Sequence, residues 1–222
     1  MEIFIDSANL EEIKYWHKLG ILKGVTTNPA LLSTQKTSPV KLLKEISNLV
    51  APYPVSAQVT KETSEDIIKQ AKFLAGINKN IVVKLPALKK YLEIVPELKK
   101  ENIKTNITLC FDPTTALLFS KVGADYVSMI IGRSEDFNLQ QSNLIQRTRE
   151  LIIGSPTKIL AASFRNPGQL EIAISHKPDI VTVPHNTLLM SLDNPISNSG
   201  VNDFKDKWQT VQKNFKDEYE TS

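Results

Sequence analysis

The chain has 222 residues, of which 41% are hydrophobic and 23% charged, and its formal net charge is +3. This length supplies one sizeable core, and no lysine-rich run with interleaved aromatics suggests nucleic-acid binding. The longest apolar runs are strand-sized, so no membrane-spanning segment is expected.

The single cysteine, Cys110, excludes an internal disulfide and a cysteine-rich metal site. Such cysteine usage is typical of a reducing compartment, so we expect a cytoplasmic protein. His17, His176 and His185 are scattered, which argues against a histidine-based metal site. The sequence begins directly with a strand pattern, so no signal peptide is expected.

The first half of the chain alternates short apolar strands with helical patterns. Its predicted strands are Glu2–Asp6, a short strand with a polar turn in Gly24–Pro29, Val55–Thr60 and Asn80–Lys84. The first predicted helix begins after the cap residue Asn9. The following ones cover Pro39–Val50, Thr63–Ala75 and Ala87–Glu101. Because proline lacks a backbone N–H, Pro96 is expected to interrupt or restart the last of these helices.

The second half repeats the same alternation. Its predicted strands are Ile103–Thr108, Asp125–Ile131, Lys158–Ala162 and Asp179–Val183. Its predicted helices are Pro113–Lys121, Phe137–Ile153, Gln169–Ser175 and Thr187–Leu192. A further amphipathic helix from Val201 to about Phe215 carries Phe204, Trp208, Val211 and Phe215 at helical spacing, and such a stripe needs burial somewhere.

Eight strand–helix units without a linker predict one domain over residues 1–222, with a helical tail from about 196 to 222. Alternation of this kind indicates a parallel sheet covered by helices, and eight units close into a TIM (β/α)8 barrel. An open doubly wound sheet is the alternative. A nucleotide-binding sheet of that type would carry a glycine-rich turn, and the chain has no GxGxxG motif.

The apolar run Ile81–Val83 ends in Lys84, and lysine is among the residues least often buried. In one interpretation, the stem of Lys84 lies on apolar surface and the ammonium reaches water. In the other, the charged form is poorly solvated and the pKa falls. The neutral amine then attacks a ketone to form a Schiff base.

In a TIM barrel the active site lies at the C-terminal ends of the strands. The polar residues that the predicted strands place there are Asp6, Thr26, Asn28, Gln58, Lys84, Thr108, Ser128, Arg133, Ser163 and Arg165. Each residue alone can be a cap, a turn residue or a surface charge. Together they predict a pocket for a phosphorylated polyol.

The chemistry of these groups suggests a division of roles. Lys84 is the predicted nucleophile, and Asp6 is the predicted general acid and base. Gln58 and Thr108 are expected to fix a water that relays protons, while Asn28 and Ser128 hold substrate hydroxyls. The phosphate is expected on the rim, where two arginines lie, with Arg133 gripping it through a planar fork and Ser163 placed at the start of a helix.

At these positions the chain resembles the transaldolase family, in particular its short, TalC-like and fructose-6-phosphate-aldolase-like members. The matching segments are Ile3–Ala8 (IFIDSA), Gly24–Leu32 (GVTTNPALL), Ala57–Val59 (AQV), Ile81–Pro86 (IVVKLP), Asn106–Leu109 (NITL), Gly123–Ser128 (GADYVS), Gly132–Arg133 (GR) and Ala161–Gln169 (AASFRNPGQ). They follow the family's order and cover nearly the whole chain.

The resemblance implies a TIM barrel, a Schiff-base lysine at Lys84, a catalytic acid at Asp6 and no cofactor. It implies phosphosugar substrates of the pentose phosphate pathway. It also implies a homo-oligomer, which in the short members is often a decamer of two five-membered rings with the C-terminal helix crossing onto a neighbour.

Two positions disagree about the reaction. Aldolases of the family have a tyrosine and transaldolases a phenylalanine where this chain has Ile130, whereas Gln58 matches the aldolase pattern. The leading hypothesis is a transaldolase that moves a dihydroxyacetone unit between phosphosugars. The alternative is fructose-6-phosphate aldolase, which releases free dihydroxyacetone. A catalytically weak barrel that serves as a binding or assembly component is the alternative from another class.

Overall fold

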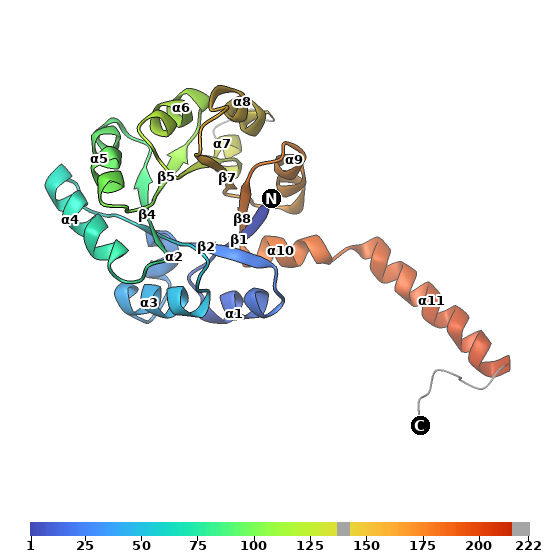
Figure 1. The fold of residues 1–222 in the computed structure, drawn as a ribbon. Coiled ribbons are helices and arrows are strands. Elements are labelled where there is room, and N and C mark those ends of the chain that lie inside the picture. Colours follow the sequence, from blue (N-terminus) through green and yellow to red (C-terminus); the bar gives the residue numbers. More distant parts are fainter. Residues whose placement is uncertain (137–142, 215–222) are drawn as a thin grey trace.

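The computed structural model describes residues 1–136 and 143–214. Its eight parallel strands pair in chain order, and β1 also pairs with β8, so the sheet closes into a barrel (Figure 1). The strands are β1 Glu2–Asp6, β2 Leu22–Thr26, β3 Val55–Gln58, β4 Ile81–Pro86, β5 Thr105–Cys110, β6 Tyr126–Ile130, β7 Lys158–Ala162 and β8 Ile180–Val183. This closure confirms the predicted TIM barrel and excludes the open sheet.

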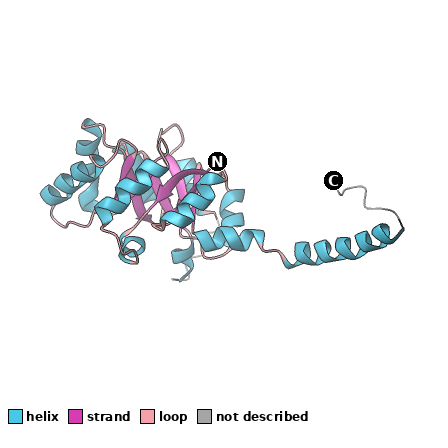
Figure 2. Cartoon of the chain, turned by 90° about the horizontal axis from the view of Figure 1, so that it is seen from below, coloured by secondary structure: helices cyan, strands magenta, loops and turns pink. Residues whose placement is uncertain are grey.

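Helices surround the barrel on its outer side (Figure 1). The helices before the tail are α1 Leu10–Lys18, α2 Pro29–Ser33, α3 Pro39–Leu49, α4 Ser64–Ala75, α5 Lys89–Lys100, α6 Pro113–Lys121, α7 Gly132–Asp136, α8 Leu144–Leu151, α9 Pro167–Ser175 and α10 His185–Leu192. The tail helix α11 Pro195–Asn214 is the predicted extra C-terminal helix. It extends away from the barrel as a separate arm (Figures 1 and 2).

The apolar core has two parts on the two sides of the sheet. The larger part lies between the strands and the helices and contains alternate strand residues such as Val83 and Leu85. The smaller part contains Phe4, Ile130, Leu160, Ala162 and Ile180, whose alternation along the strands places them inside the barrel. We call these five residues the interior plug. Two of them, Ile130 and Ala162, also form part of the apolar wall of the cavity described below.

Gly24 on β2 makes room for this plug. A Cβ at Gly24 would lie 2.6 Å from the ring of Phe4, closer than side chains pack. The absence of a side chain on β2 therefore allows the Phe4 ring to fill the barrel interior.

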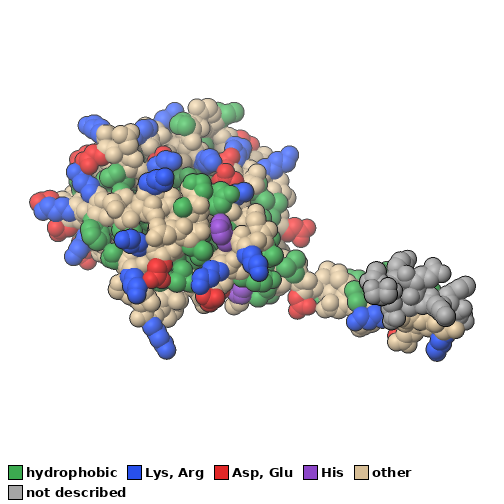
Figure 3. All heavy atoms as spheres, turned by 60° about the horizontal axis from the view of Figure 1, so that its bottom comes forward, with side chains coloured by type: hydrophobic (Ala, Val, Ile, Leu, Met, Phe, Trp, Pro, Cys, Tyr) green, Lys and Arg blue, Asp and Glu red, His purple; other side chains and the backbone are tan. Residues whose placement is uncertain are grey.

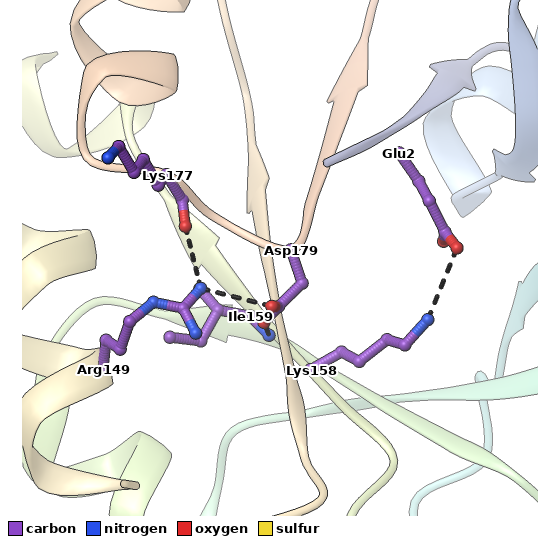
Figure 4. Close-up of polar contacts among 6 residues, drawn as sticks. All are labelled: Glu2, Arg149, Lys158, Ile159, Lys177 and Asp179. Carbon is purple, nitrogen blue, oxygen red and sulfur yellow. Dashed lines mark hydrogen bonds and ion pairs between the residues drawn. The ribbon is translucent and has the colours of Figure 1, made fainter.

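The N-terminal ends of the strands are tied together by polar contacts (Figure 4). The Asp179 carboxylate accepts a hydrogen bond from the Ile159 backbone N–H at 2.7 Å and pairs with Arg149 at 3.3 Å. Lys158 and Glu2 lie 3.5 Å apart between β7 and β1. These partly exposed ion pairs contribute little energy each, but they occupy this end of the barrel, as expected for the end away from the active site.

Only β1 and β7 have the predicted bounds, and the differences at β4 and β5 bear on the site. β4 continues past Lys84 to Pro86, because a proline at the end of a strand needs no further N–H partner, and Ala87 N–H donates to Thr108 O at 2.7 Å. β5 begins at Thr105 and extends to Cys110 instead of covering Ile103–Thr108. Both strands therefore reach further toward the end of the barrel where Lys84 lies.

The predicted interruption of the helix at Pro96 is wrong, since α5 is continuous from Lys89 to Lys100. Tyr91, Ile94, Val95 and Leu98 are buried on both sides of the proline. Their packing compensates for the lost hydrogen bond and the clash, which cost about 3 kcal/mol in an unsupported helix.

Two short helices, α2 and α7, follow β2 and β6 where the sequence predicted only turn and strand ends. The predicted helix Phe137–Ile153 is represented by α8, and its residues 137–142 lie outside the described residues. The tail helix α11 begins at Pro195, earlier than the predicted Val201, and Phe215 also lies outside the described residues.

The surface carries both signs of charge. Basic and acidic side chains are interspersed over the face of the barrel that Figure 3 presents. Within residues 1–136 and 143–214, every helix is too short or too polar to cross a membrane.

Candidate active site

A cavity of about 370 Å³ opens at the C-terminal ends of the strands, a size typical of small-molecule sites. All but two of the predicted site residues line it. The lining consists of Asp6, Asn28, Pro29, Ala30, Leu31, Gln58, Lys84, Thr108, Leu109, Ser128, Ile130, Arg133, Ala162, Ser163 and Thr182. The exceptions are Thr26 and Arg165.

Lys84 projects from β4 into this cavity and is only 7% exposed, so its amine does not reach open solvent. Its Nζ donates a hydrogen bond to the backbone carbonyl of Thr27 at 3.1 Å, a contact that a neutral amine also makes. Burial lowers the pKa of Lys84, while the nearby Asp6 carboxylate raises it. The net lowering favours the neutral, nucleophilic form.

Asp6 lies at the end of β1 on the same cavity. Loss of solvation raises its pKa, whereas Lys84 and the hydroxyl of Thr26 lower it. Thr26 Oγ1 donates to Asp6 Oδ1 at 2.7 Å. A carboxyl group with a raised pKa beside an amine with a lowered one is the arrangement expected of an acid–base pair.

Gln58 and Thr108 border the cavity from β3 and β5. In the alignment of the strands, Gln58 faces Lys84 directly. Among the described residues, neither the Gln58 amide nor the Thr108 hydroxyl has a hydrogen-bond partner. Both therefore keep their donors and acceptors for a water or a substrate in the cavity.

Ser128 is tied into a buried amide network that the sequence analysis missed. Its Oγ donates to Asn106 Oδ1 at 2.7 Å, and Asn106 Nδ2 donates to Ser56 Oγ at 3.0 Å. Asn106 aligns with Lys84 on the neighbouring strand. The signal was its period-two relation to Thr108 on β5, since residues two apart share a face.

Asn28 has two roles at once. Its side-chain oxygen caps α2 by accepting from Leu31 N–H at 3.0 Å, and its amide borders the cavity. Asn28 can therefore serve both as a helix cap and as a binding residue, because the cap holds its side-chain amide in place at the cavity.

The side of the cavity that is predicted to bind phosphate is formed by the loops after β6 and β7. Gly132 N–H donates to Ser163 O at 3.0 Å, and a Cβ on Gly132 would lie 2.1 Å from that oxygen. Only glycine permits this approach, which brings Arg133 and Ser163 to one side of the cavity. Arg133 is exposed, and no hydrogen bond or ion pair joins its guanidinium to any other described residue.

The predicted position of Ser163 at a helix start is wrong, because α9 begins at Pro167 with Asn166 as its cap. Ser163 instead lies on the loop with φ of 70°, in the left-handed region that non-glycine residues rarely adopt. Backbone strain of this kind is common where a structure presents a side chain to a ligand.

Thr26 and Arg165 were predicted to contact the substrate, and the structure does not bring them to the cavity wall. Thr26 is 1% exposed and lies behind Asp6. Arg165 has an exposed side chain, and its backbone N–H donates to Gln169 Oε1 at 2.8 Å. Thr26 therefore acts on the site through Asp6.

Among the described residues we find neither a cluster of metal ligands nor a reactive cysteine. No group of three or more histidine, cysteine, aspartate or glutamate side chains gathers there to hold a metal ion. Cys110 is fully buried, and burial raises the pKa of its thiol to about 12, which keeps it protonated and unreactive.

Comparison with known proteins agrees with this geometry. The family model described as transaldolase/fructose-6-phosphate aldolase matches residues 3–221. A curated protein of Exiguobacterium sibiricum, named "Probable transaldolase", is 40% identical over 214 residues, which is 96% of this chain and all of that relative. A "Probable transaldolase" of Thermodesulfovibrio yellowstonii is 39% identical over 215 residues, with the same coverage of both chains.

Proposed function

Since this chain belongs to the transaldolase/fructose-6-phosphate aldolase family, we propose that it transfers a dihydroxyacetone unit between phosphosugars through a Schiff base on Lys84. The observation that carries the proposal is the buried Lys84 amine beside Asp6, at the bottom of a cavity whose rim holds Arg133. Sedoheptulose 7-phosphate and fructose 6-phosphate are the expected ketoses, in the pentose phosphate pathway.

In the first step, the neutral amine of Lys84 attacks the ketone carbon and water leaves, which gives an iminium ion. The lowered pKa of Lys84 increases the share of the neutral amine that can attack. Gln58 and Thr108, whose polar groups face the cavity, hold the water that carries protons during this step.

In the second step, the bond between C3 and C4 breaks and its electrons move to the iminium, which forms an enamine on Lys84. Asp6 takes the proton of the C4 hydroxyl, and the shortened aldehyde leaves. An acceptor aldehyde then adds to the enamine, Asp6 returns the proton, and hydrolysis of the new iminium releases the longer ketose.

The second candidate is the aldolase, which protonates the enamine and releases free dihydroxyacetone. Gln58 favours it, because an amide at this position matches the aldolases and can orient a water. Ile130 argues against it, since this buried side chain has no donor and belongs to the apolar plug of the barrel. Proton delivery to carbon needs a donor within hydrogen-bond reach, so we give the missing hydroxyl more weight.

One assay with two products separates the candidates. Purified protein is given fructose 6-phosphate with and without erythrose 4-phosphate, and both sedoheptulose 7-phosphate and free dihydroxyacetone are measured. We expect transfer to exceed release. Faster release of dihydroxyacetone than transfer would favour the aldolase.

Replacing Ile130 with tyrosine should move the product ratio toward release. Ile130 borders the cavity, so the tyrosine ring can extend into it and bring a hydroxyl toward the carbons bound to Lys84. We expect a shift of a few-fold in the ratio of dihydroxyacetone to transferred product, measured in the same assay.

Ile130→Phe is the matched control, because it adds the same ring without the hydroxyl. The ratio should stay on the transfer side in this variant. If phenylalanine shifts the ratio as far as tyrosine does, ring size and not proton donation controls release.

We also infer that the protein is a homo-oligomer, with a decamer as the assembly that the family resemblance implies. On α11, Phe204 is 71% exposed, Trp208 37% and Val211 39%, which leaves an apolar stripe on an arm that extends away from its own barrel (Figures 1 and 2). We propose that a neighbouring subunit covers this stripe.

We also propose a cytoplasmic location, as the single cysteine suggested.

Truncation after Gly200 should therefore lower the oligomeric mass, as measured by light scattering. The double variant Phe204→Ser/Trp208→Ser should do the same while it keeps the chain length. Asp203→Ser/Lys207→Ser, which changes polar residues of the same helix, is the control and should leave the mass unchanged. An unaltered mass after truncation would mean that the stripe packs on its own barrel.

A further inference from the structure

A chain of buried hydroxyls runs behind Asp6 and joins three strands. Thr26 Oγ1 on β2 lies 2.7 Å from Asp6 Oδ1 on β1 and 2.6 Å from Thr182 Oγ1 on β8. Thr182 is 2% exposed and also borders the cavity. The steps proposed for the reaction leave Thr182 without a role.

Counting hydrogens fixes the direction of this chain. In the ionised form of Asp6 the carboxylate only accepts, so the single hydroxyl hydrogen of Thr26 goes to Asp6. The hydrogen between the two threonines must then come from Thr182. Thr182 thus donates to Thr26, which donates to Asp6, and each bond in such a series strengthens the next by polarisation.

We propose that Thr182 is a positioning residue that acts through Thr26 to hold the Asp6 carboxyl group in place and to stabilise its ionised form. This role rests on the proposed function of Asp6 as acid and base. Thr182 does not need to touch the substrate for this purpose.

The surroundings of Asp6 leave this role open to Thr182. Among the described residues that line the cavity, the charged ones besides Asp6 are Lys84 from β4 and Arg133 from α7, and Lys84 is the one that acts on the Asp6 carboxyl group. Both strands that flank β1 contribute neutral hydroxyls, Thr26 from β2 and Thr182 from β8. On this side of the carboxyl group, hydrogen bonds stabilise the ionised form of Asp6, whereas on the cavity side the positive charge of Lys84 stabilises it.

The direct test measures the pKa of Asp6 without any substrate. Protein labelled with ¹³C at the aspartate carboxyl groups is titrated by NMR, and Asp6→Asn assigns the signal. In Thr182→Val the pKa of Asp6 should rise by roughly 0.1 to 0.6 units, because the lost polarisation is worth a fraction of the charge-assisted hydrogen bond from Thr26 to Asp6. Thr182→Ser restores the hydroxyl and should titrate like the unaltered protein.

A double variant tests whether Thr182 acts through Thr26. Adding Thr182→Val to Thr26→Val should move the pKa of Asp6 no further than Thr26→Val alone, since the chain is already broken. Full additivity of the two shifts, no shift in Thr182→Val, or failure of serine to restore the pKa would each overturn the proposal. Thr182→Ala replaces the valine variant if valine does not fold.

The kinetic consequence separates this inference from the proposed reaction. Thr182→Val should lower kcat by roughly two- to fourfold and leave KM nearly unchanged. A raised KM with unchanged kcat would mean that Thr182 binds substrate directly, which contradicts the positioning role. If the pKa of Asp6 shifts as expected in a protein that never turns over phosphosugars, the proposed function fails and the inference about Thr182 stands.

Discussion

Replacing Lys84 with methionine should abolish turnover and leave the barrel folded. Methionine keeps the length and the apolar stem of the side chain but has no amine to form a Schiff base. Because burial lowers the pKa of Lys84, the unfolded chain binds the proton more tightly. The lysine therefore destabilises the fold as the pH falls below its ordinary pKa, and fully once the pH is below its lowered pKa in the folded protein. Methionine removes that cost, so the circular dichroism spectrum should remain that of the unaltered protein.

Trapping of the intermediate tests the same residue in the unaltered enzyme. Borohydride added with fructose 6-phosphate reduces an iminium to a stable amine, and mass spectrometry should find the added mass on Lys84. Lys104→Met is the matched control, because this exposed lysine precedes β5 at the opposite end of the barrel. It should keep both activity and the adduct.

A different labelled lysine, or active enzyme that carries no adduct at all, contradicts the Schiff-base mechanism. The distinction from a folding defect is clear, since the Lys84→Met variant is compared with Lys104→Met for its melting temperature as well as its rate. A melting temperature far below that of the control would show that the lysine supports the fold.

Much of the barrel was predictable because periodic burial dominates its local structure. The apolar run Ile81–Val83 lies in a predicted strand, and the structure has all three residues buried in β4. Prediction failed where tertiary packing outweighs local preference. Pro96 lies within a continuous helix because the apolar residues on both sides of it pack on the barrel.

The candidate site was predictable as a set of strand ends, since parallel strands bring their C-terminal residues to one rim. Residues deeper in the strands were missed. Asn106 lies two residues before Thr108 on β5, and Thr182 aligns with the residue two positions before Asp6, so both face the barrel interior. The sequence also could not show that the loop at Ser163 takes a left-handed backbone and that α9 begins later. Loop geometry depends on the contact with Gly132, which lies far away in the sequence.

Replacing Arg133 with alanine should raise KM for phosphorylated substrates far more than for their unphosphorylated analogues. The guanidinium lies on the cavity rim with no hydrogen bond or ion pair to another described residue, so its donors remain for a phosphate. Loss of a charge-assisted hydrogen bond costs about 1.5–3 kcal/mol, which corresponds to a roughly ten- to hundredfold rise in KM. The measurement compares fructose 6-phosphate with fructose at saturating acceptor.

Arg147→Ala is the matched control for this prediction. Arg147 is an exposed arginine on α8 that does not border the cavity, so its loss should change neither KM. An equal loss of activity toward phosphorylated and unphosphorylated substrates in Arg133→Ala would assign the arginine a structural role. A loss confined to the phosphorylated substrate, in contrast, would mean that its phosphate contacts the loops after β6 and β7. The substrate would then extend across the cavity from these loops, with its ketone carbon at Lys84 on β4.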